Sequence, residues 1–565
     1  MRVRFISALA LALAVIAVNW PTLRHPLVHD DLHTIVLNPA VRQARLSADF
    51  FFRPETFSSE ASMYRPLLML SYVLNLRLAG LDPLGFHLVN LGLHLLACWM
   101  VYWLARIIPP LKTWAFWIAL LFALHPVQSE LTNYISCRSD LGAAAFGLLS
   151  VAAALKLAAS EHPHPAFAFV SLLAFPIALG FKDLAVIVPA QILLLDFLGF
   201  RQARIQNYMT NRSRSFTLFS ATEVGLILLA FGYLALRHAL ALETWLIAQP
   251  ARPVWINLLT QTRALVTYLR LLIWPGHLSL EHQVPLIESI ADPSFLAAAL
   301  LLLALLVISL VRLRRNPIIG LSLGWFILCL LPTSSLVPLN VIASENRLYQ
   351  ASLASAWVLA ALAQAAAGTR RRRITQGLLL VVAFFFAALT VLRHPAWESS
   401  LTLFRDMVRK APGIARGHIN YGIELRNAHR PQDAATQYLW ALDLEPQNTR
   451  ALSNLATAYH DLGQPEQELK VLRRTLDLDP SDAVAWRNYG YLLAEQGRRE
   501  EALEAVREAV RLAPRRPDLH YDLGVMCLSL GRMEEGQREL EQSLRLNPDQ
   551  PQVKAALEMI RQGQR

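Results

Sequence analysis

The sequence predicts an all-α protein in which a polytopic bundle of membrane-spanning helices is followed by a solenoid of repeated helix pairs. Hydrophobic residues make up 54% of the 565 residues and charged residues only 17%, which is too apolar for a soluble enzyme of this size. The first 392 residues carry 29 Lys and Arg against 17 Asp and Glu, whereas the remaining residues carry 24 against 25. The excess positive charge therefore belongs to the apolar part, where it reflects membrane topology, and we expect no nucleic-acid partner.

Five prolines mark a repeat in the second part of the chain. They recur at intervals of 34 residues, the period of tetratricopeptide helix pairs, and are Pro412, Pro446, Pro480, Pro514 and Pro548. In the third repeat, Trp486, Gly490 and Ala502 stand at packing positions, where small residues let two antiparallel helices approach closely. We predict a tetratricopeptide-repeat domain over residues 394–565, with a half repeat at 397–412, four repeats at 413–548 and a capping helix at 551–562.

Apolar segments long enough to cross a bilayer fill the first part of the chain. About eleven spans are predicted, near residues 5–20, 86–106, 111–124, 140–158, 165–181, 184–200, 216–236, 293–313, 317–333, 347–367 and 374–393. The first segment could be a signal peptide, but no small-x-small cleavage site follows it at the usual place, so we expect a retained span. Residues 66–80 and 254–274 are apolar but carry arginines, and we expect both to lie along the outer interface.

The basic residues of the short connections set the expected orientation. Arginines and lysines near residues 2–4, 106–112, 201–214, 312–315 and 370–373 alternate with acid-rich loops, and loops rich in Lys and Arg are cytoplasmic. An odd number of spans then places the repeats on the non-cytoplasmic side, together with the first outer loop at residues 21–85. We expect a bacterial inner-membrane protein with periplasmic repeats or, in a eukaryote, an endoplasmic reticulum protein with lumenal repeats.

Two adjacent carboxylates, Asp30 and Asp31, follow the first predicted span. A carboxylate that is partly desolvated at the bilayer edge can accept a proton from a hydroxyl nucleophile, and a second acid beside it raises its basicity by like-charge repulsion. The alternative is helix capping, because Asp is a common N-cap residue. Both interpretations of the pair stay open at this point.

Several motifs occur in the order found in one membrane-protein family. They are "HDDLHTIVLNPAV" from residue 29, "YRPLLMLSYVLN" from 64, "FHLVNLGLHLLACWMVY" from 86, "HPVQSELTNYISCRSDL" from 125, "FKDLAVIVPA" from 181 and "SENRLYQASL" from 344. With the repeats behind them, they resemble the transmembrane and tetratricopeptide-repeat-containing O-mannosyltransferases, bacterial proteins of the same layout and, more distantly, the protein O-mannosyltransferases. The resemblance implies that residues 1–393 form a GT-C-type domain. One departure is Lys182-Asp183, where that family commonly has Lys-Glu.

The resemblance also implies which residues form the site. Asp30 and Asp31 would be catalytic, and a lipid-linked sugar phosphate would be held by fixed cations at the interface, which stabilise the phosphate as it leaves. Arg138, Lys182 and Arg347 are the expected phosphate ligands, although Lys and Arg near span ends also commonly reach for lipid headgroups. Residues expected to support the donor or acceptor site are His33, His125, Glu130, Asp140 and Glu345.

No metal or cofactor site is expected. The four cysteines lie far apart and form no CxxC pair, which argues against a zinc site and against a disulfide framework. His87 and His94 lie seven residues apart on one apolar helix face, where packing is expected rather than metal binding. Arginine and lysine would neutralise the donor phosphate, so neither a nucleotide nor a metal is needed.

The expected function is transfer of a sugar, by resemblance mannose, from a polyprenyl-phosphate donor to a hydroxyl acceptor with inversion at the anomeric carbon. Membrane lipids and a protein or peptide acceptor held by the repeats are the expected partners. Two alternatives stay open: a membrane-anchored repeat scaffold with an inactive transferase body, and a transporter of lipid-linked sugars. A scaffold needs neither paired outer carboxylates nor many spans, and a transporter is expected to carry charges near the middle of its spans.

Overall fold

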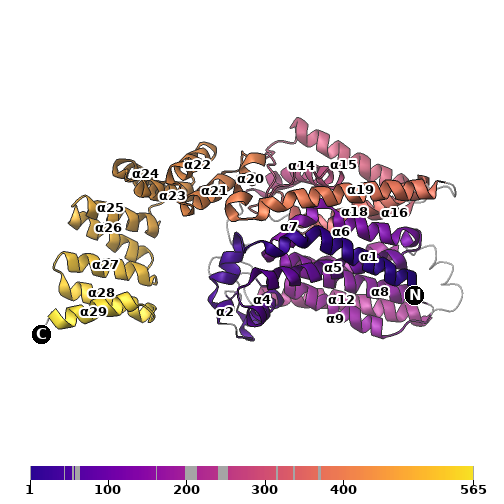
Figure 1. Cartoon of the computed structure of the whole chain (residues 1–565), viewed down its shortest axis with the longest axis horizontal. Coiled ribbons are helices and arrows are strands. Elements are labelled where there is room, and N and C mark those ends of the chain that lie inside the picture. The colour runs from indigo at the N-terminus through magenta and orange to yellow at the C-terminus, as the bar shows by residue number, and fades with distance from the viewer. Residues whose placement is uncertain are drawn as a thin grey trace. The chain divides into compact units, whose positions relative to one another are not determined.

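The computed structural model describes residues 2–43, 45–53, 56, 64–160, 162–197, 213–239, 252–312, 316–334, 338–366 and 371–563. The chain forms two compact units, Met1–Lys410 and Ala411–Arg565, which are shown in Figure 1. Within the described residues, every regular element is a helix. The all-α fold class predicted from the sequence is therefore confirmed.

The first unit contains a bundle of long helices and several short ones. Its α-helices are α1 (Arg2–Asn19), α2 (Pro39–Arg42), α3 (Asp49–Phe52), α4 (Pro66–Ala79), α5 (Pro83–Ile107), α6 (Ala115–Leu124), α7 (Ser129–Asn133), α8 (Arg138–Ala158), α9 (Ala166–Phe181), α10 (Val188–Leu195), α12 (Ser213–Ala239), α14 (Val254–Ile273), α15 (Pro293–Arg312), α16 (Pro317–Leu330), α17 (Leu348–Ala351), α18 (Leu353–Ala366), α19 (Arg372–Arg393) and α20 (Ser400–Lys410).

Six helices in the described part of the chain are long and apolar enough to cross a membrane. They run over Phe5–Arg24, Pro83–Ile107, Ile135–Ala158, Thr217–Ala239, Pro293–Arg312 and Arg372–Trp397. A bent pair, Pro109–Leu124 with Pro126–Asn133, would add a seventh span. Shorter apolar helices occupy the four other predicted segments, at Ala166–Phe181, Asp183–Leu195, Pro317–Leu330 and Leu353–Ala366. The predicted count of about eleven spans is compatible with these helices.

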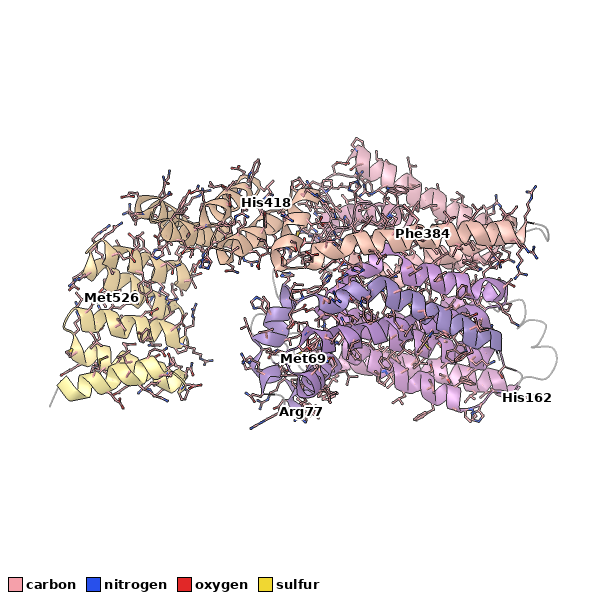
Figure 2. All side chains as sticks on the ribbon, in the orientation of Figure 1. Met69, Arg77, His162, Phe384, His418 and Met526 are labelled. Atoms are coloured by element: carbon pink, nitrogen blue, oxygen red, sulfur yellow. The ribbon has the colours of Figure 1, made fainter. Side chains whose placement is uncertain are left out.

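The outward-facing surface of these helices is apolar, as a bilayer requires. Phe384, labelled in Figure 2 on α19, is 76% exposed, and many leucines of α15 are exposed as well. Figure 1 shows the N-terminus at one end of the first unit and α2 and α4 at the other. Figure 2 labels His162, between α8 and α9, at the first of these ends and Arg77 at the second. The predicted basic connections at residues 201–212, 313–315 and 370 lie outside the described residues.

Two helices match the segments expected at the interface. α4 has 14 residues, about 21 Å of helix, which is shorter than the roughly 30 Å hydrocarbon layer. α14 has 20 residues but is amphipathic: Trp255 and Ile273 are exposed, whereas Tyr268 is fully buried. Neither helix is among the six that are long and apolar enough to span.

α20 belongs to the first unit, although the sequence predicts a half repeat of the second domain there. The compact unit ends at Lys410, not at residue 393. Arg393 at the end of α19 donates to Asp406 on α20, and Lys410 Nζ donates to the Leu278 carbonyl at 2.7 Å. These bonds attach α20 to the end of α19 and to the distant Leu278, contacts that the repeat period does not reveal.

The second unit is a solenoid of four helix pairs and a final helix. Its helices are α21 (Ala415–Asn427), α22 (Pro431–Leu444), α23 (Thr449–Asp461), α24 (Pro465–Leu478), α25 (Ala483–Glu495), α26 (Arg499–Leu512), α27 (Pro517–Ser529), α28 (Met533–Leu546) and α29 (Pro551–Gly563). A Cβ added at Gly490 would lie 2.7 Å from Val506 Cγ2, so the predicted close approach of paired helices is confirmed. Val553 and Leu557 of α29 pack with Leu540 of α28, as expected of a capping helix.

Candidate active site

Asp31 is fully buried and anchored by three hydrogen bonds. The backbone N–H and the hydroxyl of Ser136 donate to Asp31 Oδ1, at 2.8 and 2.6 Å, and the N–H of Val28 donates to Oδ2 at 3.2 Å. Ser136 lies in the short helix Ile135–Cys137, directly before α8. Asp31 therefore fixes the loop after α1 to the start of α8.

The burial of Asp31 also changes its acidity. Loss of water around the carboxyl group raises its pKa from 3.8 to about 7, against the opposing effect of the Ser136 and Val28 hydrogen bonds. Burial disfavours the charged form of an acid, whereas hydrogen-bond donors favour it. Near neutral pH, Asp31 can thus be either protonated or ionised.

Asp30 is the accessible member of the pair. Its side chain is 56% exposed, with His29 Nε2 3.4 Å from Oδ1, and its backbone N–H donates to the Tyr134 hydroxyl at 3.2 Å. His33 lies in the next turn, Leu32–Val36, and is partly buried. Of the two predicted catalytic carboxylates, Asp30 is the one that a substrate can reach.

His29 holds the loop in an unusual backbone conformation. Its φ angle is +53°, which costs a non-glycine residue roughly 1–2 kcal/mol. The ring stacks on Tyr134, with centroids 6.1 Å apart, and meets Phe404 edge-on at 5.1 Å, while the His29 N–H donates to Ser400 Oγ at 3.2 Å. Both Phe404 and Ser400 belong to α20, so this helix holds the turn immediately before Asp30.

Arg138 is fully buried and bound to protein groups. It donates to Asn90 Oδ1 at 2.8 Å, to the Phe86 carbonyl at 3.0 Å and to the carbonyl and hydroxyl of Ser71 at 3.3 and 3.2 Å. Its guanidinium carbon lies 5.0 Å from the centre of the Tyr72 ring. Arg138 thereby connects α4, α5 and α8. In this conformation its guanidinium group has no exposed surface that could contact the expected donor phosphate.

Lys182 and Asp183 each form an ion pair, Lys182 with a residue earlier in the chain and Asp183 with a residue later in the chain. Lys182 Nζ lies 2.7 Å from both carboxylate oxygens of Asp140 on α8, and both side chains are mostly buried. Arg237 Nη1, on α12, lies 2.6 Å from Asp183 Oδ2. The Lys-Asp dipeptide therefore joins the end of α9 to α8 and α12 and gathers two cations at one place.

Glu345 is a fully buried carboxylate with two hydrogen-bond donors. It accepts hydrogen bonds from the backbone N–H of Ser279 and from His282 Nε2, the latter at 2.9 Å. Glu130 on α7 is also buried, and the charged groups near enough to influence it are Glu345, Asp140, Arg393 and Lys182. The structure thus brings together two of the predicted supporting carboxylates.

Two other predicted site residues are occupied by backbone contacts. Arg347 donates to the carbonyls of Ile342 at 2.9 Å and Val341 at 2.7 Å. His125 is buried, and its Nε2 lies 3.1 Å from the Leu272 carbonyl. These contacts hold the connections between helices of the bundle in place.

One short stretch, from Tyr134 to Asp140, connects the predicted groups. Tyr134 and Ser136 contact the carboxylate loop, and Asp140 contacts Lys182. Sequence reasoning did not single out Tyr134 or Ser136, although both lie inside the quoted motif, and it missed Arg237. Across the described residues, no group of three or more His, Cys, Asp or Glu is placed to hold a metal ion.

Comparisons with known proteins identify the repeats. Tetratricopeptide-repeat family models match residues 422–483 and 493–560. Among solved structures, a MamA fragment from Desulfovibrio magneticus RS-1 is 23% identical, with a TM-score of 0.25, and the match covers 27% of this chain and 85% of that one. PilF from Pseudomonas aeruginosa is 28% identical, with a TM-score of 0.25, and the match covers 26% and 67% of the two chains.

Relatives of known name match most of the chain. Protein O-mannosyl-transferase TMTC1 of Mus musculus is 25% identical over 551 residues, covering 78% of this chain and 58% of the mouse protein. The human protein of the same name is 27% identical over 492 residues, covering 78% and 55%. The chain therefore spans little more than half the length of these relatives. The matches and the repeats confirm the resemblance of this chain to the transmembrane and tetratricopeptide-repeat-containing O-mannosyltransferase family.

Proposed function

We propose that the chain is a membrane glycosyltransferase of GT-C type that moves a mannosyl group from a polyprenyl-phosphate donor to a hydroxyl group of a protein, on the non-cytoplasmic side. The observation that carries the proposal is the carboxylate loop. Asp30 is accessible, while its neighbour Asp31 is buried and fixed to the start of α8. The names of the relatives support mannose and a protein acceptor.

In this proposal Asp30 is the general base. The acceptor hydroxyl gives its proton to the Asp30 carboxylate while its oxygen attacks the anomeric carbon. The bond between that carbon and the phosphate oxygen breaks on the opposite face, so a single displacement inverts the anomeric centre. The polyprenyl phosphate leaves with the electron pair, and the neighbouring cations stabilise its charge.

We propose that Lys182 and Arg237 stabilise the leaving phosphate. Arg237 was not among the phosphate ligands expected from the sequence. Each is paired with one carboxylate at the end of a helix, and an arriving phosphate would share these charges. Arg347 stays in the proposed set. Arg138 is proposed to act indirectly, since its hydrogen bonds position α4, α5 and the Ser136 turn rather than a substrate.

The tetratricopeptide repeats are proposed to bind the protein acceptor, because stacked helix pairs provide an extended binding surface. The second candidate is a repeat scaffold with an inactive transferase body. The two repeat-family matches support protein binding by the repeats, which both candidates share.

The deciding experiment is incubation of the purified chain with radiolabelled polyprenyl-phosphate mannose and a membrane-protein extract. Label in protein, released as mannose by acid hydrolysis, is expected. Absence of label from protein with every polyprenyl-phosphate sugar supplied would favour the scaffold. Polyprenyl-phosphate glucose and galactose, supplied in parallel, report on the choice of sugar.

The proposed side of the membrane has its own test. The four native cysteines are buried, so a cysteine introduced at the exposed residue 37, in the loop near residue 28, or in the repeats can be labelled selectively with an impermeant thiol reagent. We expect both of these to react from outside and one at residue 208 to stay unlabelled. The opposite pattern would contradict an external active site.

A further inference from the structure

Two arginines of the first unit, Arg252 and Arg347, lie near each other without a carboxylate partner. Arg252 is buried just before the start of α14, and Arg347 ends the short helix Glu345–Arg347. Burial and the positive charge of Arg347 both lower the pKa of Arg252. Within the part of the chain that the structure describes, no acid forms an ion pair with either side chain. A buried charge is costly unless an opposite charge compensates it, so this arginine pair lacks a counter-ion.

Neutral groups hold both side chains of the arginine pair. Arg252 Nε and Nη2 donate to Asn257 Oδ1 at 3.0 and 2.8 Å, and Nη2 also donates to the Leu339 carbonyl at 3.0 Å. Arg347 donates to two further carbonyls of the same loop, at residues 341 and 342. The loop therefore gathers two guanidinium groups from distant parts of the sequence. Because amide and carbonyl oxygens carry no net charge, the double positive charge stays uncompensated.

The start of α14 adds positive potential beside Arg252. This helix has 20 residues, and its first turn has neither a side-chain cap nor an acidic residue. The first N–H groups of a helix have no partner within the helix, and the N-terminus carries a partial positive charge that favours anions. An anion at this place would therefore be stabilised by the helix as well as by the two guanidinium groups.

The side chains next to Arg252 are those expected at a membrane interface. Val254, Trp255 and Leu258, in the first turns of α14, are all exposed. Tryptophan is enriched at the level of the lipid headgroups, and an amphipathic helix lies in that plane with its apolar face toward the acyl chains. Lipid phosphate is the most abundant anion at this depth. The arginine pair is thus suited to a phosphate that is carried by a lipid.

We propose that Arg252 and Arg347 form a binding site for the phosphate group of a lipid at the membrane surface. A guanidinium group offers a planar pair of donors that matches two phosphate oxygens, and it keeps its charge in a poorly hydrated place. The ligand is a phosphate ester on a long-chain lipid, either the polyprenyl-phosphate donor or a phospholipid of the bilayer. Where the lipid is the donor, the inference rests on the proposed function and adds Arg252 to the groups that hold its phosphate.

The test is lipid binding by the full chain in neutral detergent, without an acceptor and without a sugar on the lipid. The probes are radiolabelled polyprenyl phosphate and phosphatidylglycerol, each compared with its phosphate-free counterpart, polyprenol or diacylglycerol, and inorganic phosphate is the competitor. Arg252→Gln removes the charge but keeps hydrogen-bond donors, and Arg252→Lys keeps the charge but loses the planar fork. The matched control is Arg270→Gln, which removes an exposed arginine from the last turn of α14.

Circular dichroism and the unfolding midpoint establish that each variant folds. If Arg252→Gln does not fold, Arg347→Gln is measured in its place, with the same expected result.

We expect a phosphate-bearing lipid to bind more tightly than its phosphate-free counterpart, and this advantage to fall about tenfold or more in Arg252→Gln, less in Arg252→Lys and not at all in Arg270→Gln. An effect confined to polyprenyl phosphate identifies the donor as the ligand, and an equal effect with phosphatidylglycerol identifies a phospholipid headgroup. An unchanged advantage in Arg252→Gln would overturn the proposal, as would an equal loss in Arg270→Gln or inorganic phosphate binding as tightly as the lipids.

The same measurement separates this site from the proposed function. Because neither sugar nor acceptor is present, lipid binding is measured independently of transfer. A chain that transfers no mannose but binds lipid phosphate through Arg252 would contradict the proposed function and leave the arginine pair intact.

Discussion

In the first unit, several charged side chains are buried and paired with residues far away in the sequence, whereas in the second unit several ion pairs join residues three positions apart on exposed helix faces. Asp140 and Lys182 are mostly buried and come from different helices. Arg498 with Glu501 and Arg511 with Glu508 are neighbours on single helices in contact with water.

This contrast separates two uses of charge. A buried charge costs several kcal/mol unless it is paired, so it persists where it fixes geometry or takes part in chemistry. An exposed pair contributes about 0–1 kcal/mol, because water screens it. Substitutions in the two units should therefore differ greatly in effect.

The largest expected effect is on catalysis, at Asp30. Asp30→Asn should reduce transfer roughly 100- to 10,000-fold, the usual cost of losing a general base, with little change in stability because the side chain is more than half exposed. The matched control is Asp49→Asn, in the same connection between α1 and α4, whose side chain is also 56% exposed. Initial rates of mannose transfer measure both, and near-normal turnover of Asp30→Asn would move the search to Glu130 or Asp140.

The next effect is on stability, at Arg138. Arg138→Ala leaves the buried Asn90 amide oxygen without its donor and removes a second donor from the helix carbonyls of Phe86 and Ser71, and it empties a fully buried site; a buried unsatisfied group costs about 1–3 kcal/mol. We expect a loss of about 3 kcal/mol or more in the free energy of unfolding, and partial rescue by Arg138→Lys.

Arg77→Ala, exposed at the end of α4, is the control for Arg138. Denaturant unfolding in detergent and donor titration distinguish the two roles considered for this arginine. Unchanged unfolding of Arg138→Ala together with a raised donor requirement would restore Arg138 to the phosphate site.

Asp31 should make stability depend on pH. Because burial raises its pKa to about 7, the unfolded chain releases this proton near pH 4 and the folded chain only near pH 7. The free energy of unfolding should therefore fall as the pH rises through this window, by roughly 3 kcal/mol between pH 5 and 8 from this group alone.

Asp31→Asn has no proton to release, so its unfolding should be less sensitive to pH, while Asp49→Asn should keep the wild-type profile. Unfolding midpoints at pH 5 and pH 8 measure the difference. If the wild type and Asp31→Asn showed identical profiles, Asp31 would be ionised across the whole range.

The two units also differ in how far the sequence predicts them. Each repeat packs only on its neighbours, so the proline period is enough to predict the four helix pairs. In the bundle, Asp30 and Asp31 could be predicted because they are adjacent carboxylates, and Lys182 and Arg138 could be predicted from the motifs that contain them. The partners of these residues could not be predicted, because Arg237 meets Asp183 across 54 residues and His282 meets Glu345 across 63, with no period to reveal either pair. Arg393 and Asp406, which are 13 residues apart and hold α20 against α19, likewise follow no repeat pattern.

The smallest effects are expected in the solenoid, and they differ between two kinds of ion pair there. Glu508→Gln breaks a pair on α26 in which Arg511 is exposed and Glu508 partly exposed, so the unfolding midpoint should change little. Arg487→Met should matter more, because Asp522 is buried, with a pKa that burial raises, and would lose one of its two donors. The remaining Tyr491 hydroxyl limits the loss to about 1–3 kcal/mol. Equal midpoints for the two variants would mean that the Arg487–Asp522 pair is as well hydrated as the exposed pairs, and the contrast between the units would then depend on the bundle alone.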